Sequence, residues 1–247
     1  DNIAEALTTV VKPVATPVAS LNAETTSEGT VVTWTKAENT VSEIVEDFES
    51  YKGNTIYTDG EYCGDWQAVD VSKGENYGWS NRDIQWPHTW KVFAFGIVDI
   101  KSSCLDTKAQ LTALSGVNAL GFFSEVNVET GDDQRSDRYV ISPELPGMAQ
   151  TIVFGTCVFT NAYGAEEYEV LASSTDARVE SFTKLADYKQ SELGWQTISV
   201  RLPEGTKYFA IHYKTPCAFG MLVDDINYVA GGAALTGYNI YVDQAKE

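Results

Sequence analysis

The sequence predicts an all-β protein, a jelly roll or β-sandwich, on the basis of three observations. Short runs of alternating or β-branched residues recur along most of the 247-residue chain, and only residues 107–114 suggest a helical turn. Clusters of Gly, Asn, Asp and Ser, such as residues 131–133, separate these runs and are typical of turns between antiparallel strands. Hydrophobic residues make up 43% of the chain and aromatic residues 12%, which is enough to fill a core. Short, regularly spaced strands indicate a sandwich or jelly roll.

Each predicted strand depends on its own pattern. Residues 31–34 are β-branched and aromatic, residues 151–159 form a nearly continuous apolar run, and residues 167–173 alternate acidic with apolar side chains. The other strands are predicted either from alternation of apolar and polar residues or from enrichment in β-branched residues. In chain order the predicted strands are residues 31–34, 92–97, 118–123, 139–142, 151–159, 167–173, 196–201, 208–214, 221–229 and 238–242.

Two fragments near the ends of the chain predict a split domain. Residues 31–35 and 235–241 both have the composition of strands and are expected to be neighbours in one small β-domain. Neither fragment buries a core alone, because a two-stranded unit is marginally stable in water. The long middle segment is able to fold independently, so the chain is expected to carry one complete domain inserted into an incomplete one.

The charge of the chain argues against two classes of partner. Thirty-five acidic and 17 basic residues give a formal net charge of -18, which repels nucleic acid phosphates and anionic membranes. No stretch approaches the about 18 consecutive apolar residues of a membrane-spanning helix. We therefore expect no nucleic acid partner and no membrane insertion. The acidity favours solubility and also supplies hard oxygen ligands for calcium.

The four cysteines, Cys63, Cys104, Cys157 and Cys217, are widely separated and contain no Cys-x-x-Cys pair. Their spacing excludes zinc-ribbon and thioredoxin-type sites. An even number permits two disulfides, which fit an exported protein. Cys157, however, lies in an apolar run where a buried thiol is equally suitable, so both alternatives stay open.

The sequence predicts no catalytic residue. Its two histidines are His88, in a loop beside a proline, and His212, inside a predicted strand where a structural role is expected. No nucleophile elbow, His-Glu-x-x-His helix or glycine-rich phosphate loop occurs. Glycosidase chemistry needs only two carboxylates, so a glycoside-active enzyme stays open as a distant alternative.

The middle segment resembles a known family through seven patterns that occur in the family's order. They are residues 45–49 (Val-Glu-Asp-Phe-Glu), the loop tryptophans Trp66 and Trp79, residues 136–145, residues 167–176, Gly194 with Trp195, residues 208–213 and residues 222–226. In this order they resemble the choice-of-anchor J or cleaved-adhesin family, MAM-like jelly-roll modules of Bacteroidetes-type surface and secreted proteins. The resemblance covers residues 42–229 and implies a non-catalytic adhesion module that is exported to the cell surface or secreted.

The outer segments resemble early strands of a fibronectin type III domain, with residues 17–23, 30–35 and 237–242 as its strands. The resemblance divides the chain into four parts. We expect a linker or upstream remainder at 1–16, the first fibronectin type III-like strands at 17–41, the jelly roll at 42–229 and the return strand at 230–247.

A structural calcium site is the sharpest chemical hypothesis, and the family resemblance implies it. In a jelly roll the opening strand, residues 46–48, lies beside the closing strand, residues 222–226. Glu49, Asp224 and Asp225 are then expected to converge as oxygen ligands for calcium. Asp47 and Glu49 are expected on one face of the strand and Phe48 in the core. The alternative is a pair of solvated acidic strand ends.

Tryptophans in loops suggest ligand binding. Trp79, Trp86 and Trp90 lie in polar sequence containing glycine or proline, where an indole stacks on a sugar or anchors a protein interface. The alternative is local packing of these side chains. We therefore predict an extracellular adhesion module that binds a carbohydrate or a matrix or host protein, joined to neighbouring domains of the same polypeptide. A structural spacer that displays other domains is the competing hypothesis.

Overall fold

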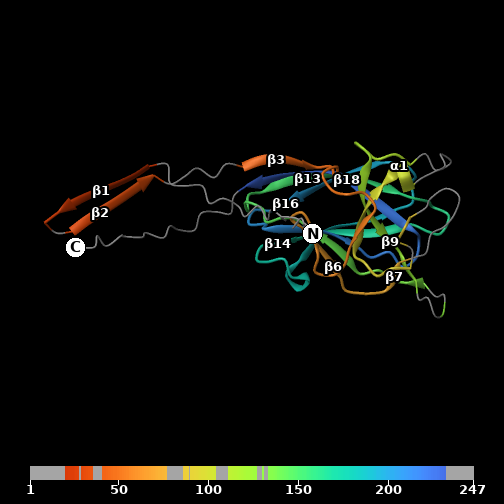
Figure 1. Ribbon diagram of the computed structural model, residues 1–247. Coiled ribbons are helices and arrows are strands. Elements are labelled where there is room, and N and C mark those ends of the chain that lie inside the picture. Colours follow the sequence, from red (N-terminus) through yellow and green to blue (C-terminus); the bar gives the residue numbers. More distant parts are fainter. Residues whose placement is uncertain are drawn as a thin grey trace, which may run out of the picture. The chain divides into compact units, whose positions relative to one another are not determined.

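A computed structural model describes residues 20–27, 29–35, 41–76, 86–88, 90–103, 111–126, 130 and 133–231 (Figure 1). The chain divides into two compact units, Asp1–Val41 with Gly231–Glu247, and Ser42–Ala230. In the first unit the described part is an antiparallel hairpin of β1 (Ser20–Thr26) and β2 (Gly29–Thr35). The predicted return strand at 237–242 lies outside the described residues. Its pairing, and the fibronectin type III-like assignment, therefore stay predictions.

One face of the second unit is a six-stranded sheet with the order β15-β14-β17-β12-β6-β5. All five neighbouring pairs are antiparallel. The strands are β5 (Tyr62–Cys63), β6 (Trp66–Asp70), β12 (Arg138–Ile141), β14 (Glu166–Ser173), β15 (Thr183–Gln190) and β17 (Tyr208–Tyr213).

The other large sheet has seven strands in the order β16-β13-β18-β9-β8-β4, and its seventh strand, β3, also pairs with β18. The opening and closing strands of the second unit are therefore neighbours. The strands are β3 (Val41–Glu46), β4 (Thr55–Tyr57), β8 (Phe95–Asp99), β9 (Asn118–Phe123), β13 (Gln150–Val158), β16 (Gln196–Leu202) and β18 (Gly220–Gly231).

Smaller elements complete the described part of this unit. A three-stranded sheet has the order β11-β10-β7, from β7 (Glu75–Asn76), β10 (Glu125–Val126) and β11 (Asp133–Gln134). The two described helices are short, α1 (Ile100–Ser103) and the 3-10 helix η1 (Val179–Ser181). Neither is long and apolar enough to cross a membrane.

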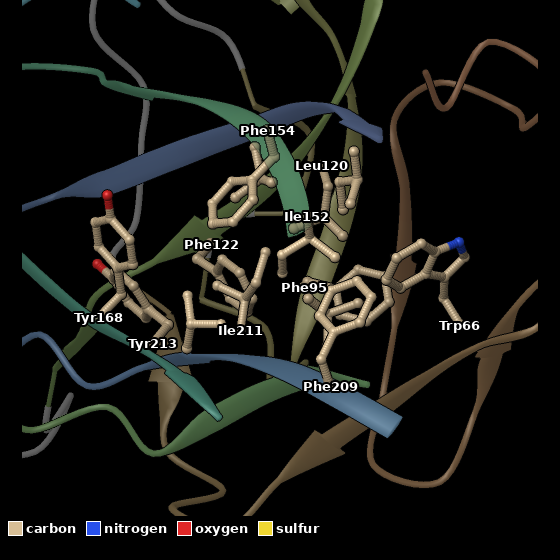
Figure 2. Close-up of a cluster of buried hydrophobic side chains, with 14 of the residues drawn as sticks. Trp66, Phe95, Leu120, Phe122, Ile152, Phe154, Tyr168, Phe209, Ile211 and Tyr213 are labelled. Carbon is tan, nitrogen blue, oxygen red and sulfur yellow. The ribbon is translucent and has the colours of Figure 1, made fainter. Parts of the chain in front are cut away.

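The core forms where the two large sheets face each other. Alternation sends every second side chain of a strand inward, so each sheet contributes one apolar face. Figure 2 shows side chains from both sheets meeting between the strands. The seven-stranded sheet contributes Phe95, Leu120, Phe122, Ile152 and Phe154, and the six-stranded sheet contributes Trp66, Tyr168, Phe209, Ile211 and Tyr213. Phe122 and Tyr213 stack across this interface, with ring centroids 5.2 Å apart.

The predicted fold class is confirmed, since the described chain is nearly all antiparallel β-structure in a sandwich. The helical turn expected at 107–114 is wrong for residues 111–114, which are irregular; the other four residues lie outside the described ranges. Sequence reasoning also missed β15. It is an edge strand whose Lys184, Asp187 and Lys189 are exposed, so it carries little apolar signal.

Two of the cysteines are buried free thiols, Cys63 and Cys157. Burial raises the pKa of the Cys63 thiol to about 12 and that of the Cys157 thiol to about 11. Both groups therefore behave as small apolar core residues rather than as disulfide partners. Cys104 lies outside the described residues.

Candidate functional site

Two of the tryptophans predicted to bind a ligand, Trp86 and Trp90, lie before β8 and differ in exposure. Trp86 is only 3% exposed, whereas Trp90 is 47% exposed. Trp79 lies outside the described residues. Of the described pair, Trp90 alone therefore presents its indole ring to a ligand.

Trp86 is a core residue, which corrects its predicted role as a ligand-binding residue. Its ring stacks on Phe123 with centroids 5.1 Å apart and also packs near Phe93. A Cβ atom added at Gly96 would come within 2.9 Å of the indole, so the glycine makes room for the ring. The indole nitrogen has no hydrogen-bond partner among the described residues, and the contacts that hold the side chain there are packing contacts with other rings.

Trp90 has a backbone conformation that is unusual for a large side chain. Its φ angle is +58°, in the left-handed region that disfavours residues with a Cβ atom. Such conformations persist only where the surrounding structure enforces them, and they cluster at functional sites. The strain therefore marks this loop as a candidate site.

Contacts on both sides of Trp90 hold the loop. The backbone amide of Asn76 donates to the carbonyl oxygen of Lys91 at 2.9 Å, and the Asn76 side-chain amide donates to the same oxygen at 2.7 Å. On the other side, His88 Nε2 lies 2.7 Å from the carbonyl oxygen of Asn54, and its ring packs edge-on against Trp86. The exposed indole is thus presented by a pre-organised loop.

A buried arginine in turn holds Asn76. Arg138 is fully buried, and its Nη1 donates to Asn76 Oδ1 at 2.5 Å. Its Nη2 lies 2.8 Å from Glu125 Oε1, and its Nε lies 3.4 Å from Asp70 Oδ1. Ser72 Oγ bridges these two carboxylates. Arg138 and the four residues around its guanidinium form the Arg138 network. The four residues are Asp70, Ser72, Asn76 and Glu125.

In the network, two buried carboxyl groups, those of Asp70 and Glu125, share one guanidinium as their positively charged partner. Burial raises the pKa of Glu125, although Arg138 and the Ser72 hydroxyl oppose the shift. One carboxylate oxygen, Asp70 Oδ2, is buried and has no hydrogen-bond partner in the part of the chain that the structure describes. These residues were not predicted from the sequence. One sequence pattern does indicate the network. Arg138 lies two residues before Val140 in an apolar strand, so its charged side chain is expected to point inward on the same face.

The three predicted calcium ligands all contact one loop, residues 114–118. Glu49 Oε1 accepts hydrogen bonds from the backbone amides of Val117 and Asn118, at 2.8 and 2.5 Å. The segment around Glu49 is not a strand as predicted, because β3 ends at Glu46 and Phe48 has a φ of +57°. Phe48 is buried in the core, as expected.

The two aspartates reach the same loop from β18. Asp224 Oδ2 accepts hydrogen bonds from the backbone amides of Leu114 and Ser115, at 3.0 and 3.3 Å. Asp225 Oδ1 accepts a 2.6 Å hydrogen bond from the Ser115 hydroxyl. Burial, with a smaller contribution from Asp225, raises the pKa of Asp224 to about 7, although backbone amides oppose the shift.

The chemistry of this acidic set fits calcium, which takes carboxylate and carbonyl oxygens. In the described ranges no Lys, Arg or His forms an ion pair with Glu49, Asp224 or Asp225, so their charge is not compensated by a side chain. The three do not meet at one point, however, because no group of three potential ligands among the described residues is close enough to hold a metal ion. Further oxygens would have to come from backbone carbonyls and water.

His212 lies on the outer face of the six-stranded sheet. Its Nε2 is 2.9 Å from Asp137 Oδ1, its Nδ1 is 3.1 Å from Glu169 Oε2, and its ring stacks on Tyr139 at a centroid distance of 4.0 Å. Burial alone would raise the pKa of Glu169. Hydrogen bonds from Lys214 and His212 outweigh the effect of burial, so the pKa of Glu169 is lowered. These contacts use both ring nitrogens in holding neighbouring strands together.

Truncation of Trp86 and of Trp90 tests their assignment. We expect Trp86→Ala to lower the free energy of unfolding by about 3–5 kcal/mol, because it empties a buried aromatic site. Trp90→Ala should change it by less than about 0.5 kcal/mol, because the side chain lies at the surface. Urea denaturation measures both, with Tyr163→Ala as a matched exposed control. Equal losses for Trp86→Ala and Trp90→Ala would show that Trp90 is also a core residue.

Comparisons with known proteins agree on the fold. The K2 cleaved adhesin domain of Lys-gingipain matches with a TM-score of 0.54 and 20% identity, covering 75% of this chain and 97% of that one. The K3 cleaved adhesin domain of Lys-gingipain from Porphyromonas gingivalis matches with a TM-score of 0.50 and 26% identity, covering 78% of this chain and 100% of that one. No curated protein sequence matches.

The sequence of the chain also matches a family model. The model is described as the Cleaved Adhesin Domain. It aligns with residues 85–228, from Gln85, next to Trp86, to Tyr228 in β18. This range is more than half of the chain and includes the Trp90 loop, Arg138 and the two aspartates of β18. The chain therefore belongs to the Cleaved Adhesin Domain family.

Proposed function

We propose that this chain is a non-catalytic recognition module of an exported bacterial surface or secreted protein, and that it contacts its ligand through Trp90. One observation carries the proposal: an exposed indole at a strained backbone position, held by the buried Arg138 network. Because strain persists only where other contacts maintain it, an exposed tryptophan of this kind is better explained by binding than by packing.

The chemistry around Trp90 favours a glycan. An indole offers a large, rigid apolar face with little conformational entropy to lose, and it stacks on the apolar face of a sugar ring. Val92, next to Lys91, is 42% exposed and extends the apolar surface. The net charge of -18 disfavours polyanionic ligands. An extracellular protein is the second ligand class, because tryptophan also anchors protein interfaces.

The family supports a binding role. Its description and the titles of the matched gingipain structures name adhesin domains. The competing proposal is a spacer that positions neighbouring domains of the same polypeptide. A spacer has no need of a strained and exposed tryptophan, so the geometry of Trp90 favours recognition.

Binding of the purified full chain to an array of glycans and extracellular matrix proteins tests the proposal. We expect a specific signal that Trp90→Ala abolishes and that Tyr163→Ala, which removes another exposed aromatic side chain, leaves intact. A blank array would contradict recognition and favour the spacer. An array on which every signal survives Trp90→Ala would contradict recognition through Trp90.

We further propose that a structural calcium ion binds beside loop 114–118, and that the carboxylates of Glu49, Asp224 and Asp225 turn toward it as ligands when it binds. The supporting observation is that three carboxyl groups, one of them fully buried, surround a single loop and have no Lys, Arg or His partner among the described residues. A bound divalent cation supplies the missing positive charge and would stabilise the loop against the two strands.

Thermal unfolding tests this calcium site. Calcium should raise the melting temperature by several degrees over a chelated sample, because a ligand that binds only the folded state stabilises it. The shift should disappear in Glu49→Gln and remain in Glu144→Gln, whose carboxylate pairs with Lys207 elsewhere on the surface. Identical melting temperatures with calcium and with chelator would rule out the site.

A further inference from the structure

An open groove of about 570 Å³ runs along β6, separate from the Trp90 loop. One side is formed by β6 and the turn that follows it, and the other by the segment around η1. Gln67 and Val69 line the groove, because alternate residues of β6 point outward while Trp66, Ala68 and Asp70 are buried. The volume lies within the range of small-molecule sites in proteins, about 300–1,000 Å³.

The base of the groove is apolar and supported by the sheet. Val69, Ala177 and Val179 pack against a cluster on the outer face of the six-stranded sheet. Tyr139, opposite Val69 in the strand register, belongs to that cluster. The groove is therefore built on packed strands and does not depend on loops alone.

An exposed aromatic ring flanks the groove. Tyr62 is 57% exposed and lies directly opposite Gln67 in the pairing of β5 with β6. Opposed residues of paired strands share one face of the sheet, so the phenol ring and the groove-lining amide are neighbours. An aromatic ring next to a side-chain amide matches both the apolar face and the hydroxyl groups of a sugar.

The charges around the groove are largely paired. Lys73 Nζ lies 3.3 Å from Asp59 Oδ2, and Arg178 Nη2 lies 2.8 Å from Asp176 Oδ2. Glu180 adds a carboxylate to the lining. Pairing leaves hydrogen-bonding capacity but no excess of positive charge, which disfavours an anionic ligand on a chain of net charge -18.

We propose that this groove is a second binding site and that it takes a neutral oligosaccharide. The ring of Tyr62 would stack on one sugar unit, and the side-chain amide of Gln67 would form hydrogen bonds with the hydroxyl groups of that sugar. The site goes beyond recognition through Trp90, since none of its residues belongs to the Trp90 loop.

Isothermal titration calorimetry of the full chain tests the groove. The probes are cellotetraose, mannotetraose and laminaritetraose, with a heparin tetrasaccharide and spermidine as charged alternatives. We expect at least one neutral tetrasaccharide to bind, and Tyr62→Ala and Gln67→Ala each to weaken its affinity by at least about tenfold. Tyr163→Ala, which removes an exposed ring outside the groove, should leave that affinity within about twofold.

The outcomes separate this site from the Trp90 loop. Binding that is lost in Trp90→Ala but kept in Tyr62→Ala would overturn the groove while supporting the proposed function. Binding of the heparin fragment or spermidine alone, or of none of the five probes at millimolar concentration, would also overturn the proposal. Unchanged melting temperatures of Tyr62→Ala and Gln67→Ala would confirm that any loss of affinity is local.

Discussion

A single buried guanidinium joins the three sheets of the second unit. Arg138 extends from β12 of the six-stranded sheet and contacts Asp70 of β6 in the same sheet. It also donates to the Phe123 carbonyl of the seven-stranded sheet at 2.8 Å, and it binds Asn76 and Glu125 of the three-stranded sheet. The fork geometry of arginine allows these contacts at once, which a lysine could not reproduce. Because the charge is fully buried, its partners are indispensable.

The same arginine lies behind both candidate surfaces. Through Asn76 it holds the Lys91 carbonyl and so supports the strained backbone of Trp90. Through Asp70 it contacts a residue that lines the β6 groove. A buried charged network is thus placed where it pre-organises two surfaces at once, and pre-organisation lowers the entropy lost when a ligand binds.

Some of this organisation is predictable from local sequence, and some depends on distant contacts. β9 and β13 were predicted well. All of β9 and the second half of β13 are buried on both sides, and burial on both sides leaves nearly continuous apolar runs. Trp86 and Trp90 share one short polar segment, yet only the first is buried, because Phe123 packs against it from another strand. No local pattern distinguishes the two residues. The common attachment of Glu49 and Asp224 to loop 114–118 likewise depends on tertiary structure, since the loop is far from both in sequence.

Equilibrium urea unfolding of Arg138→Met, alone and combined with Glu125→Gln, tests the central role of the network most directly. Removing the guanidinium leaves two buried carboxylates without their cation, so the single variant should lose about 3–5 kcal/mol of stability. Glu125→Gln removes one of these charges, and the double variant should therefore be more stable than Arg138→Met. A single variant within about 0.5 kcal/mol of the unchanged chain, or a double variant no more stable than the single one, would contradict the account.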